Sequence, residues 1–311
     1  MIIDIHSHIA FKKIFPSKFM SEISDSFPVK KENERLVINH IMNAGLMDST
    51  ASTFLNKMDD ARIDKSVLLI ADFGIALGEP ELSLEQIFEL HKEVIDTNPD
   101  RFIVFGGVDP RRGVKGVELF EKSIIEYKFK GLKLYPPCGF ELDDPGLYPL
   151  YEICNLYGLP VLTHTGPSLK ILNQEKKYPS SILKVASEFK NIKFVLGHGG
   201  ARDCDTTREI TKKRKNVFFD ISTFQRFLSR EEMNIQFRSF CDECPDRIMF
   251  GTDYPMFLLS ATQKKLVETI ENIESISSNE KEAIFYKNAC HVLNIEEKLL
   301  VNNTNNNHQK C

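Results

Sequence analysis

Short apolar runs recur along the chain, and most are followed by a segment whose apolar residues have helical spacing. The eight runs that we expect to be strands are residues 2–8, 66–71, 102–109, 131–135, 160–164, 192–198, 217–222 and 248–253. Helical spacing covers residues 84–97, 113–127, 147–156, 181–189 and 231–241, and residues 260–295 are expected to form two terminal helices. Strands that alternate with helices and are apolar on both faces are typical of parallel sheets. The pattern therefore predicts an α/β fold, a closed (β/α)8 barrel (TIM barrel).

A doubly wound open sheet is the competing architecture. It would require a Gly-rich, phosphate-binding turn after the first strand, and Ser7-His8-Ile9-Ala10-Phe11 is not such a turn. Helix-end signals agree with the proposed elements. Asn98-Pro99 and Gly158 each follow a helical segment, while Ser83 and Asp203 each precede one as a candidate N-cap. These signals favour the barrel.

We expect one domain over residues 1–300. Two stretches of the chain lie outside its repeat of strands and helices. Residues 10–50 form a long insertion after the first strand, and its phenylalanines are too many for a freely solvated loop. They are Phe11, Phe15, Phe19 and Phe27. We expect this insertion to cover the catalytic mouth as a lid, with packing on outer helices or on another subunit as the alternative. The polar tail, residues 301–311, is expected to be disordered.

Side chains that can bind metals stand at the ends of several predicted strands. His6 and His8 end the first strand, His164 the fifth, His198 the sixth and Asp253 the eighth. The carboxyl ends of barrel strands converge on one face, where functional residues lie. Imidazoles and a carboxylate suit zinc or a similar divalent ion with a position left for water. We expect one zinc ion on His6, His8, His164 and Asp253, with a second ion or another divalent metal as alternatives.

The remaining candidates have more than one interpretation. His198 either binds a second metal ion or acts as an acid–base group beside a single ion. Lys133, in the fourth predicted strand, either binds a substrate carboxylate, or is carbamylated and bridges two ions, or extends to solvent at the barrel mouth. Arg202, after the sixth strand, is expected to bind an acidic substrate together with Lys133. Asp253 is expected to relay a proton as well as bind the metal.

The composition of the chain limits the kinds of molecule that it is expected to bind. The net charge of −4 and the pI near 6.1 predict binding neither to nucleic acid nor to an anionic membrane. The chain has no apolar run of membrane-spanning length and no signal-peptide pattern at its start. Its seven cysteines are odd in number and scattered, which favours reduced thiols in a cytoplasm, and Cys241 and Cys244 are interpreted as helix-end thiols. We expect a small-molecule substrate and allow for a homodimer.

Several motifs, in this order along nearly the whole chain, resemble the amidohydrolase superfamily. They are Asp4-Ile5-His6-Ser7-His8, Gly131-Leu132-Lys133-Leu134-Tyr135-Pro136, Leu147-Tyr148-Pro149-Leu150-Tyr151-Glu152, the run from Gly158 to Gly166, Leu196-Gly197-His198-Gly199-Gly200 and Phe250-Gly251-Thr252-Asp253-Tyr254-Pro255. The resemblance is to the amidohydrolase-related (amidohydrolase 2) branch of metal-dependent hydrolases and decarboxylases. It implies that His6, His8, His164 and Asp253 hold the metal and that His198 assists catalysis or binds a second ion. The terminal segment 288–293 departs from the family pattern by carrying Cys290 and His291.

The leading functional hypothesis is a hydrolase in which a metal-activated water cleaves an amide, ester or lactone bond of a small molecule. The alternative is a zinc-dependent, non-oxidative decarboxylase of a small carboxylic acid. Both reactions use the same ligands, so the motifs do not separate them. A third hypothesis, a non-catalytic metal-binding protein on the same barrel, is disfavoured because every ligand and Asp253 are present.

Overall fold

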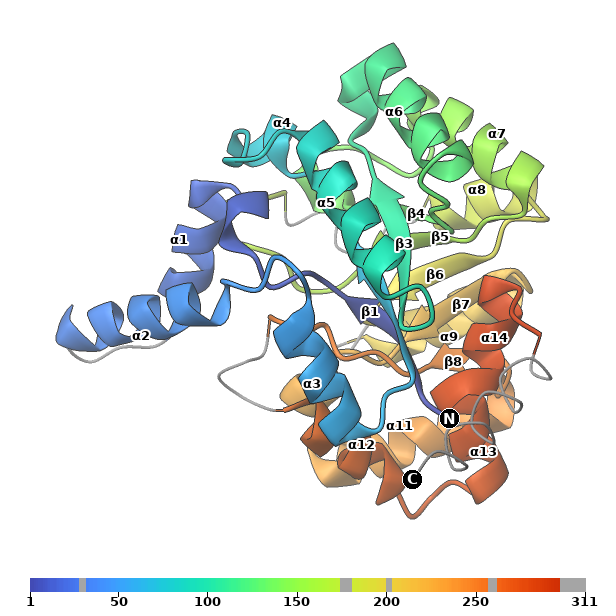
Figure 1. Cartoon of the computed structure of the whole chain (residues 1–311). Coiled ribbons are helices and arrows are strands. Elements are labelled where there is room, and N and C mark those ends of the chain that lie inside the picture. Colours follow the sequence, from blue (N-terminus) through green and yellow to red (C-terminus); the bar gives the residue numbers. More distant parts are fainter. Residues whose placement is uncertain (28–31, 174–180, 200–202, 257–261, 297–311) are drawn as a thin grey trace, which may run out of the picture.

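Eight parallel strands form one sheet whose spatial order is the order of the sequence. The structure is a computed structural model that describes all residues except 28–31, 174–180, 200–202, 257–261 and 297–311 (Figure 1). The strands are β1 (Ile3–Ser7), β2 (Lys65–Leu69), β3 (Phe102–Gly107), β4 (Leu132–Leu134), β5 (Val161–His164), β6 (Phe194–Gly197), β7 (Val217–Asp220) and β8 (Ile248–Met249). Each strand lies within one predicted run, except that β2 begins one residue before its run, and every strand is shorter than its run.

The sheet closes on itself between the last strand and the first. Just beyond β8, the Phe250 carbonyl accepts a hydrogen bond from the Ile5 amide at 3.0 Å, and the Asp253 amide donates to the His6 carbonyl at 2.7 Å. A parallel bridge also joins Ser7 to Tyr254. The predicted (β/α)8 barrel is therefore confirmed.

Helices follow the strands and surround the barrel (Figure 1). They are α1 (Ser17–Asp25), α2 (Glu32–Gly45), α3 (Ser52–Ala61), α4 (Gly74–Leu77), α5 (Leu84–Thr97), α6 (Gly113–Ile125), α7 (Tyr148–Tyr157), α8 (Ile182–Glu188), α9 (Cys204–Lys213), α10 (Phe224–Phe227), α11 (Arg230–Glu243), α12 (Gln263–Glu271), α13 (Ser278–Glu282) and α14 (Asn288–Leu293). A π-helical stretch (Ala283–Lys287) joins α13 to α14. The last part of the barrel therefore has two helical stretches, α12 and the joined α13–α14, as predicted.

The helix-end predictions hold at the residue level. Ser83 and Gln86 form a capping box at the start of α5, and the Asp203 side chain accepts a hydrogen bond from an amide in the first turn of α9. Gly158 ends α7 with φ of 64°, a left-handed conformation that glycine adopts without strain. Cys241 lies in the last turn of α11 and Cys244 at its C-cap, and both thiols are free.

Two apolar clusters hold the barrel together. The larger one fills the space between the strands and the outer helices. The smaller one takes alternate residues from most of the strands and three from α14, and it therefore fills the barrel interior below the strand ends. Cys290 belongs to this interior cluster and is 2% exposed. The departure from the family pattern at that position is accommodated as ordinary core packing.

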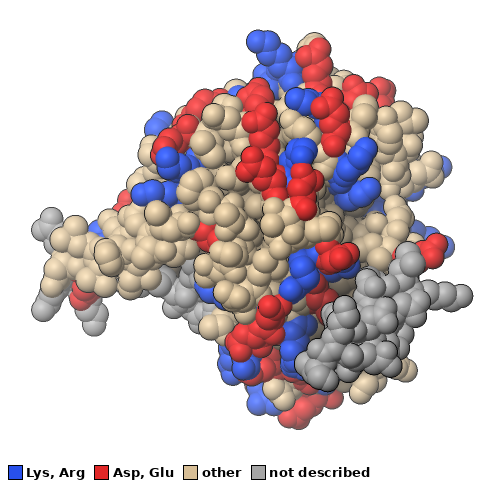
Figure 2. All heavy atoms as spheres, in the orientation of Figure 1, with Lys and Arg blue, Asp and Glu red and all other residues tan. Residues whose placement is uncertain are grey.

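The insertion of residues 10–50 behaves differently from the barrel. It contains the helices α1 and α2, which project from one side of the molecule (Figure 1). Leu36, Val37 and Ile41 on α2 are 68%, 57% and 44% exposed. In Figure 2, charged side chains are spread over the barrel face, whereas this projecting part carries few of them. Among the described residues, no helix is both long and apolar enough to cross a membrane. The tail 301–311 lies outside the described residues.

Candidate metal centre

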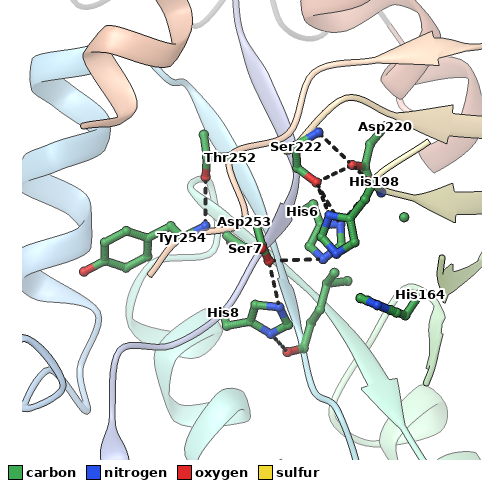
Figure 3. A network of polar contacts seen from close by, with 12 residues as sticks. His6, Ser7, His8, His164, His198, Asp220, Ser222, Thr252, Asp253 and Tyr254 are labelled. Carbon is green, nitrogen blue, oxygen red and sulfur yellow. Dashed lines mark hydrogen bonds and ion pairs between the residues drawn. The ribbon is translucent and has the colours of Figure 1, made fainter. Parts of the chain in front are cut away.

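The first strand brings two imidazoles to the mouth of the barrel. Its pairing register with β2 shifts between Asp4 and Ser7, so the backbone is irregular where the histidines leave the strand. His6 Nε2 lies 3.5 Å and His8 Nε2 3.6 Å from the same oxygen, Oδ1 of Asp253 (Figure 3). The structure therefore brings His6, His8 and Asp253 together, and their role as metal ligands stays a prediction.

Hydrogen bonds fix which nitrogen of each β1 histidine faces the centre. His6 Nδ1 lies 2.8 Å from Oδ2 of Asp220, and His8 Nδ1 lies 2.7 Å from the Leu69 carbonyl. Both partners are acceptors, so each Nδ1 carries the proton and donates. The Nε2 lone pairs of His6 and His8 are therefore left facing Asp253. Such outer partners set the orientation of metal-binding histidines in proteins.

The same logic applies to the histidines from β5 and β6. His164 Nε2 lies 3.2 Å from the Pro167 carbonyl, so Nε2 donates and Nδ1 keeps its lone pair. His198 Nδ1 lies 2.8 Å from the Ser222 hydroxyl. The His198 ring stacks on His6 at 4.5 Å between centroids and meets His164 edge-on at 4.8 Å. The four histidine rings thus form a chain of contacts that runs from His8 through His6 and His198 to His164.

Two of the converging side chains come from strained backbone. His198 has φ of 68° and Asp253 has φ of 55°, in the left-handed region that non-glycine residues rarely adopt. Strain of this kind persists where the surrounding structure holds the residue in place. Ligand atoms of His6, His198 and Asp253 all lie within 4.8 Å of one another, which is the spacing of a group that can hold a metal ion. Among the described residues, this group contains His198 and does not contain His8 or His164, two of the four ligands that the sequence predicted.

The electrostatics of the pocket suit a cation. Burial lowers the pKa of His6, His164 and His198 well below the usual value of 6.5, so these imidazoles are neutral near pH 7. Neutral imidazole is the form that binds metals, and with the Asp253 carboxyl it makes a nitrogen-rich donor set typical of zinc sites. The residues present therefore fit a divalent ion.

Lys133 lies at the floor of the same pocket. Its side chain is 2% exposed, and Nζ has no hydrogen-bond partner among the described residues. Burial lowers the pKa of the Lys133 ammonium to about 8, against the opposing attraction of Asp220 and Asp253. A buried cationic group without a partner is unfavourable, so this position calls for an anionic group.

Asp220, at the end of β7, is a central residue that the sequence analysis missed. It is fully buried, and its Oδ1 accepts the amides of His198 and Ser222, both at 3.0 Å. Its Oδ2 accepts His6 Nδ1. The signal was present in the sequence, because Asp220 ends an apolar run in the same way as the metal candidates do.

Asp4 is a second buried acid beneath the site. Its Oδ1 accepts the amides of His6 at 3.1 Å and Thr252 at 2.9 Å, and its Oδ2 accepts the Thr252 hydroxyl at 2.6 Å. Burial, the largest effect, raises the pKa of Asp4 to about 7. These bonds join β1 to the segment that carries Asp253, so Asp4 fixes the two ligand-bearing segments relative to each other.

A cavity of about 270 Å³ opens over these groups. His6, His8, Lys133, His164, His198 and Asp253 all line it, together with Phe15, Phe19, Ile23, Phe27, Phe73, Tyr135 and Arg226. Side chains of the 10–50 insertion therefore border the pocket. Ring contacts run without a break from the insertion to a candidate ligand, from Phe19 to Phe73 (4.7 Å), Tyr135 (4.9 Å) and His164 (4.1 Å). Arg202, the other predicted substrate contact, lies outside the described residues.

Comparison with known proteins agrees with this geometry. The sequence matches the Amidohydrolase family over residues 3–295. The chain belongs to this family. A curated relative is 2-amino-3-carboxymuconate-6-semialdehyde decarboxylase of Dictyostelium discoideum, 29% identical over 109 residues. That match covers 34% of this chain and spans about 30% of the relative's length.

Solved structures show the same fold over nearly the whole length of this chain. A 5-carboxyvanillate decarboxylase from Novosphingobium aromaticivorans, complexed with manganese and 4-hydroxy-3-methoxy-5-nitrobenzoic acid, superposes with a TM-score of 0.70 at 15% identity. The superposition covers 94% of this chain and 96% of the decarboxylase chain. A 4-oxalomesaconate hydratase from Rhodopseudomonas palustris gives a TM-score of 0.62 at 21% identity, covering 99% and 100%.

Proposed function

We propose that this protein is a metal-dependent, non-oxidative decarboxylase of a small carboxylic acid. The observation that carries the proposal is Lys133, a buried amine without a hydrogen-bond partner among the described residues, on the floor of a pocket that also holds the candidate ligands. A substrate carboxylate would satisfy that amine. The curated decarboxylase relative supports this reaction over the hydrolysis that we first expected from the sequence.

We propose that His6, His8, His164 and Asp253 hold one divalent ion, zinc or manganese. The imidazole-rich donor set favours zinc, while manganese is the ion in the decarboxylase structure that shares the fold. When bound, the ion would stabilise negative charge on substrate oxygens. The chain's contribution is to hold four histidine lone pairs and one carboxylate in place before the substrate arrives.

The reaction breaks the bond between the carboxylate carbon and its neighbour. Carbon dioxide leaves, the electron pair stays on the neighbouring carbon, and that carbon takes one proton, so no oxidant is required. Lys133 would orient the leaving carboxylate, and Phe15, Phe19 and Phe73 exclude water from it. Asp253 and His198 would hold and pass the proton, because both face the cavity beside the candidate ligands.

We further propose that the 10–50 insertion acts as a lid. Phe15 and Phe19 on this segment line the cavity and stack on each other, and Phe19 meets Phe73, in the loop after β2, in a tilted ring contact. A closing segment of this kind would exclude water and select the substrate. Substrate binding by Arg202 remains a prediction.

The experiment is product analysis with the metal-loaded, full-length chain. We would incubate zinc-loaded and manganese-loaded protein with aromatic and unsaturated carboxylic acids labelled with ¹³C at the carboxyl group, and with lactones and amides in parallel. Release of ¹³CO₂ that disappears after chelation and in Asp253→Asn supports the proposal. Hydrolysis of lactones or amides without release of CO₂ from any acid would restore the hydrolase hypothesis and refute this one.

A further inference from the structure

We propose that Ser222 is a positioning residue for His198, and that its hydroxyl determines which imidazole nitrogen faces the cavity without a proton. The inference rests on the proposed function, in which His198 exchanges a proton during the reaction. It concerns a residue that follows β7 and has no place in the sequence motifs that define the metal site.

The argument begins at Asp220. Its carboxyl group is fully buried, and it receives two backbone amides and His6 Nδ1. Amides can only donate, so the Asp220 oxygens act as acceptors. The Ser222 hydroxyl lies 2.5 Å from Oδ1 of Asp220, and its single proton is therefore donated to that oxygen.

The direction of the next hydrogen bond follows. With its proton committed to Asp220, the Ser222 oxygen has only lone pairs to offer to His198 Nδ1, which lies 2.8 Å away. His198 Nδ1 must therefore carry the proton and donate it to the Ser222 oxygen (Figure 3). In the neutral form of the ring, Nε2 is then left with a lone pair, and His198 lines the cavity. The chain from Asp220 through Ser222 to His198 fixes one tautomer.

Ser222 controls the ring of His198 separately from its backbone. The His198 amide donates directly to Asp220, which holds the left-handed backbone whether or not Ser222 is present. Stacking on His6 also keeps the plane of the ring. Ser222→Ala would therefore remove the determinant of the tautomer while leaving the ring in place. The form with the proton on Nε2 becomes populated, and that form cannot accept a proton from the cavity.

The kinetic test compares Ser222→Ala with Ser123→Ala, which removes a buried serine hydroxyl bonded to its own helix α6 and outside the site. We expect Ser222→Ala to lower kcat by roughly 10- to 100-fold, with little change in KM and unchanged metal content, and Ser123→Ala to leave all three unchanged. In a His198→Asn background the effect of Ser222→Ala should vanish, since the two residues act as one unit. An equal loss in that background, or loss of metal, would overturn the proposal.

A second measurement does not depend on activity. Long-range ¹H–¹⁵N spectra of the full chain labelled at histidine report which ring nitrogen carries the proton. We expect His198 of the wild-type protein to be protonated at Nδ1, and Ser222→Ala to show a mixture of the two tautomers. If His198 keeps its wild-type tautomer in Ser222→Ala, the inference is wrong even where decarboxylation has been observed. If the mixture appears in a protein that releases no CO₂, the positioning role stands and the proposed function fails.

Discussion

The pocket is built from two regions that are held in place in different ways. On the barrel side, hydrogen bonds to the buried carboxyl groups of Asp220 and Asp4 hold His6, the backbone of His198 and the segment that carries Asp253. On the insertion side, Phe19 of α1 packs against Phe73, polar contacts such as that of Ser24 with Asn39 join α1 to α2, and α2 leaves Leu36 68% exposed. A further cavity of about 590 Å³ lies among these helices and α3. The chemical centre is therefore held by buried hydrogen bonds, whereas the insertion has an exposed outer face.

This contrast fits the division of labour in barrel enzymes. Chemistry requires side chains that are held before the substrate binds, which buried hydrogen bonds provide. Substrate choice requires a surface that can change between relatives, which loops and inserted segments provide. We therefore expect substitutions in the barrel to change rates and metal content, and substitutions in the insertion to change KM and the range of substrates.

The largest effect should come from Asp253→Asn. Asparagine keeps the shape but cannot accept a proton, so we expect kcat to fall by a factor on the order of 10⁴. Metal affinity should fall less than it does when a histidine is lost. Steady-state kinetics combined with elemental analysis of the purified variant measures both. Retained turnover in Asp253→Asn would contradict the role of Asp253 in the chemistry at the barrel.

His198→Asn is expected to lower kcat by a factor on the order of 10² to 10⁴, the range for losing an acid–base group. KM and metal content should change little, because the ion is assigned to His6, His8, His164 and Asp253. Kinetics on metal-loaded protein tests this expectation. If His198→Asn loses its metal, His198 is a ligand and the assignment of a single ion to the other four residues is wrong.

Lys133→Met should raise KM by about 10- to 100-fold, because the substrate carboxylate loses its cationic partner. The same change should stabilise the metal-free protein by about 1–3 kcal/mol, since it removes a buried amine that has no partner among the described residues. Chemical denaturation and kinetics measure the two effects. Lys65→Met, at the amino end of β2, is the control and should leave KM unchanged. A lower stability with an unchanged KM would show that Lys133 is structural.

The pKa of Lys133 adds a dependence on pH. Its value near 8 means that the ammonium form, which binds a carboxylate, is lost as the pH rises through about 8. We therefore expect kcat/KM to fall above that pH in the wild-type protein, because kcat/KM reports groups of the free enzyme. In Lys133→Arg the guanidinium stays charged, and the fall should disappear from the profile. A profile that is identical in both proteins would assign the titration to another group.

The sequence predicted the barrel and indicated candidate ligands, because both depend on local pattern. An apolar strand followed by histidine or aspartate places that side chain on the catalytic face of any such barrel, wherever the neighbouring strands lie. The partners of these ligands could not be predicted in the same way. Asp220 contacts His6 across 214 positions of sequence, and that contact exists only because the barrel closes between β8 and β1.

The insertion shows the opposite limit of sequence analysis. Its phenylalanines predicted packing but not its direction, because an apolar ring fits equally against a pocket wall or an outer helix. In the structure, Phe19 meets Phe73 in a tilted ring contact and lines the cavity. The lid function itself remains a proposal, since a wall that borders a pocket need not move.

The smallest expected effect comes from a substitution in the 10–50 insertion. Phe19→Ala should raise KM several-fold and broaden the range of accepted acids, while kcat for a good substrate and metal content stay the same. Leu36→Ala, on the exposed face of α2, is the matched control and should change neither. Kinetics over a panel of acids of different size measures the effect. If Phe19→Ala and Leu36→Ala behave alike, the insertion does not select the substrate.

The central claim is that His6, His8 and His164, with Asp253, hold a single divalent ion. Elemental analysis of the purified full-length chain tests it most directly, with wild type compared to the double variant His6→Ala, His8→Ala after both are supplied with zinc and dialysed. The account predicts about one ion per chain in the wild type and near none in the variant. Near-zero metal in the wild type, or equal metal in both proteins, would contradict it.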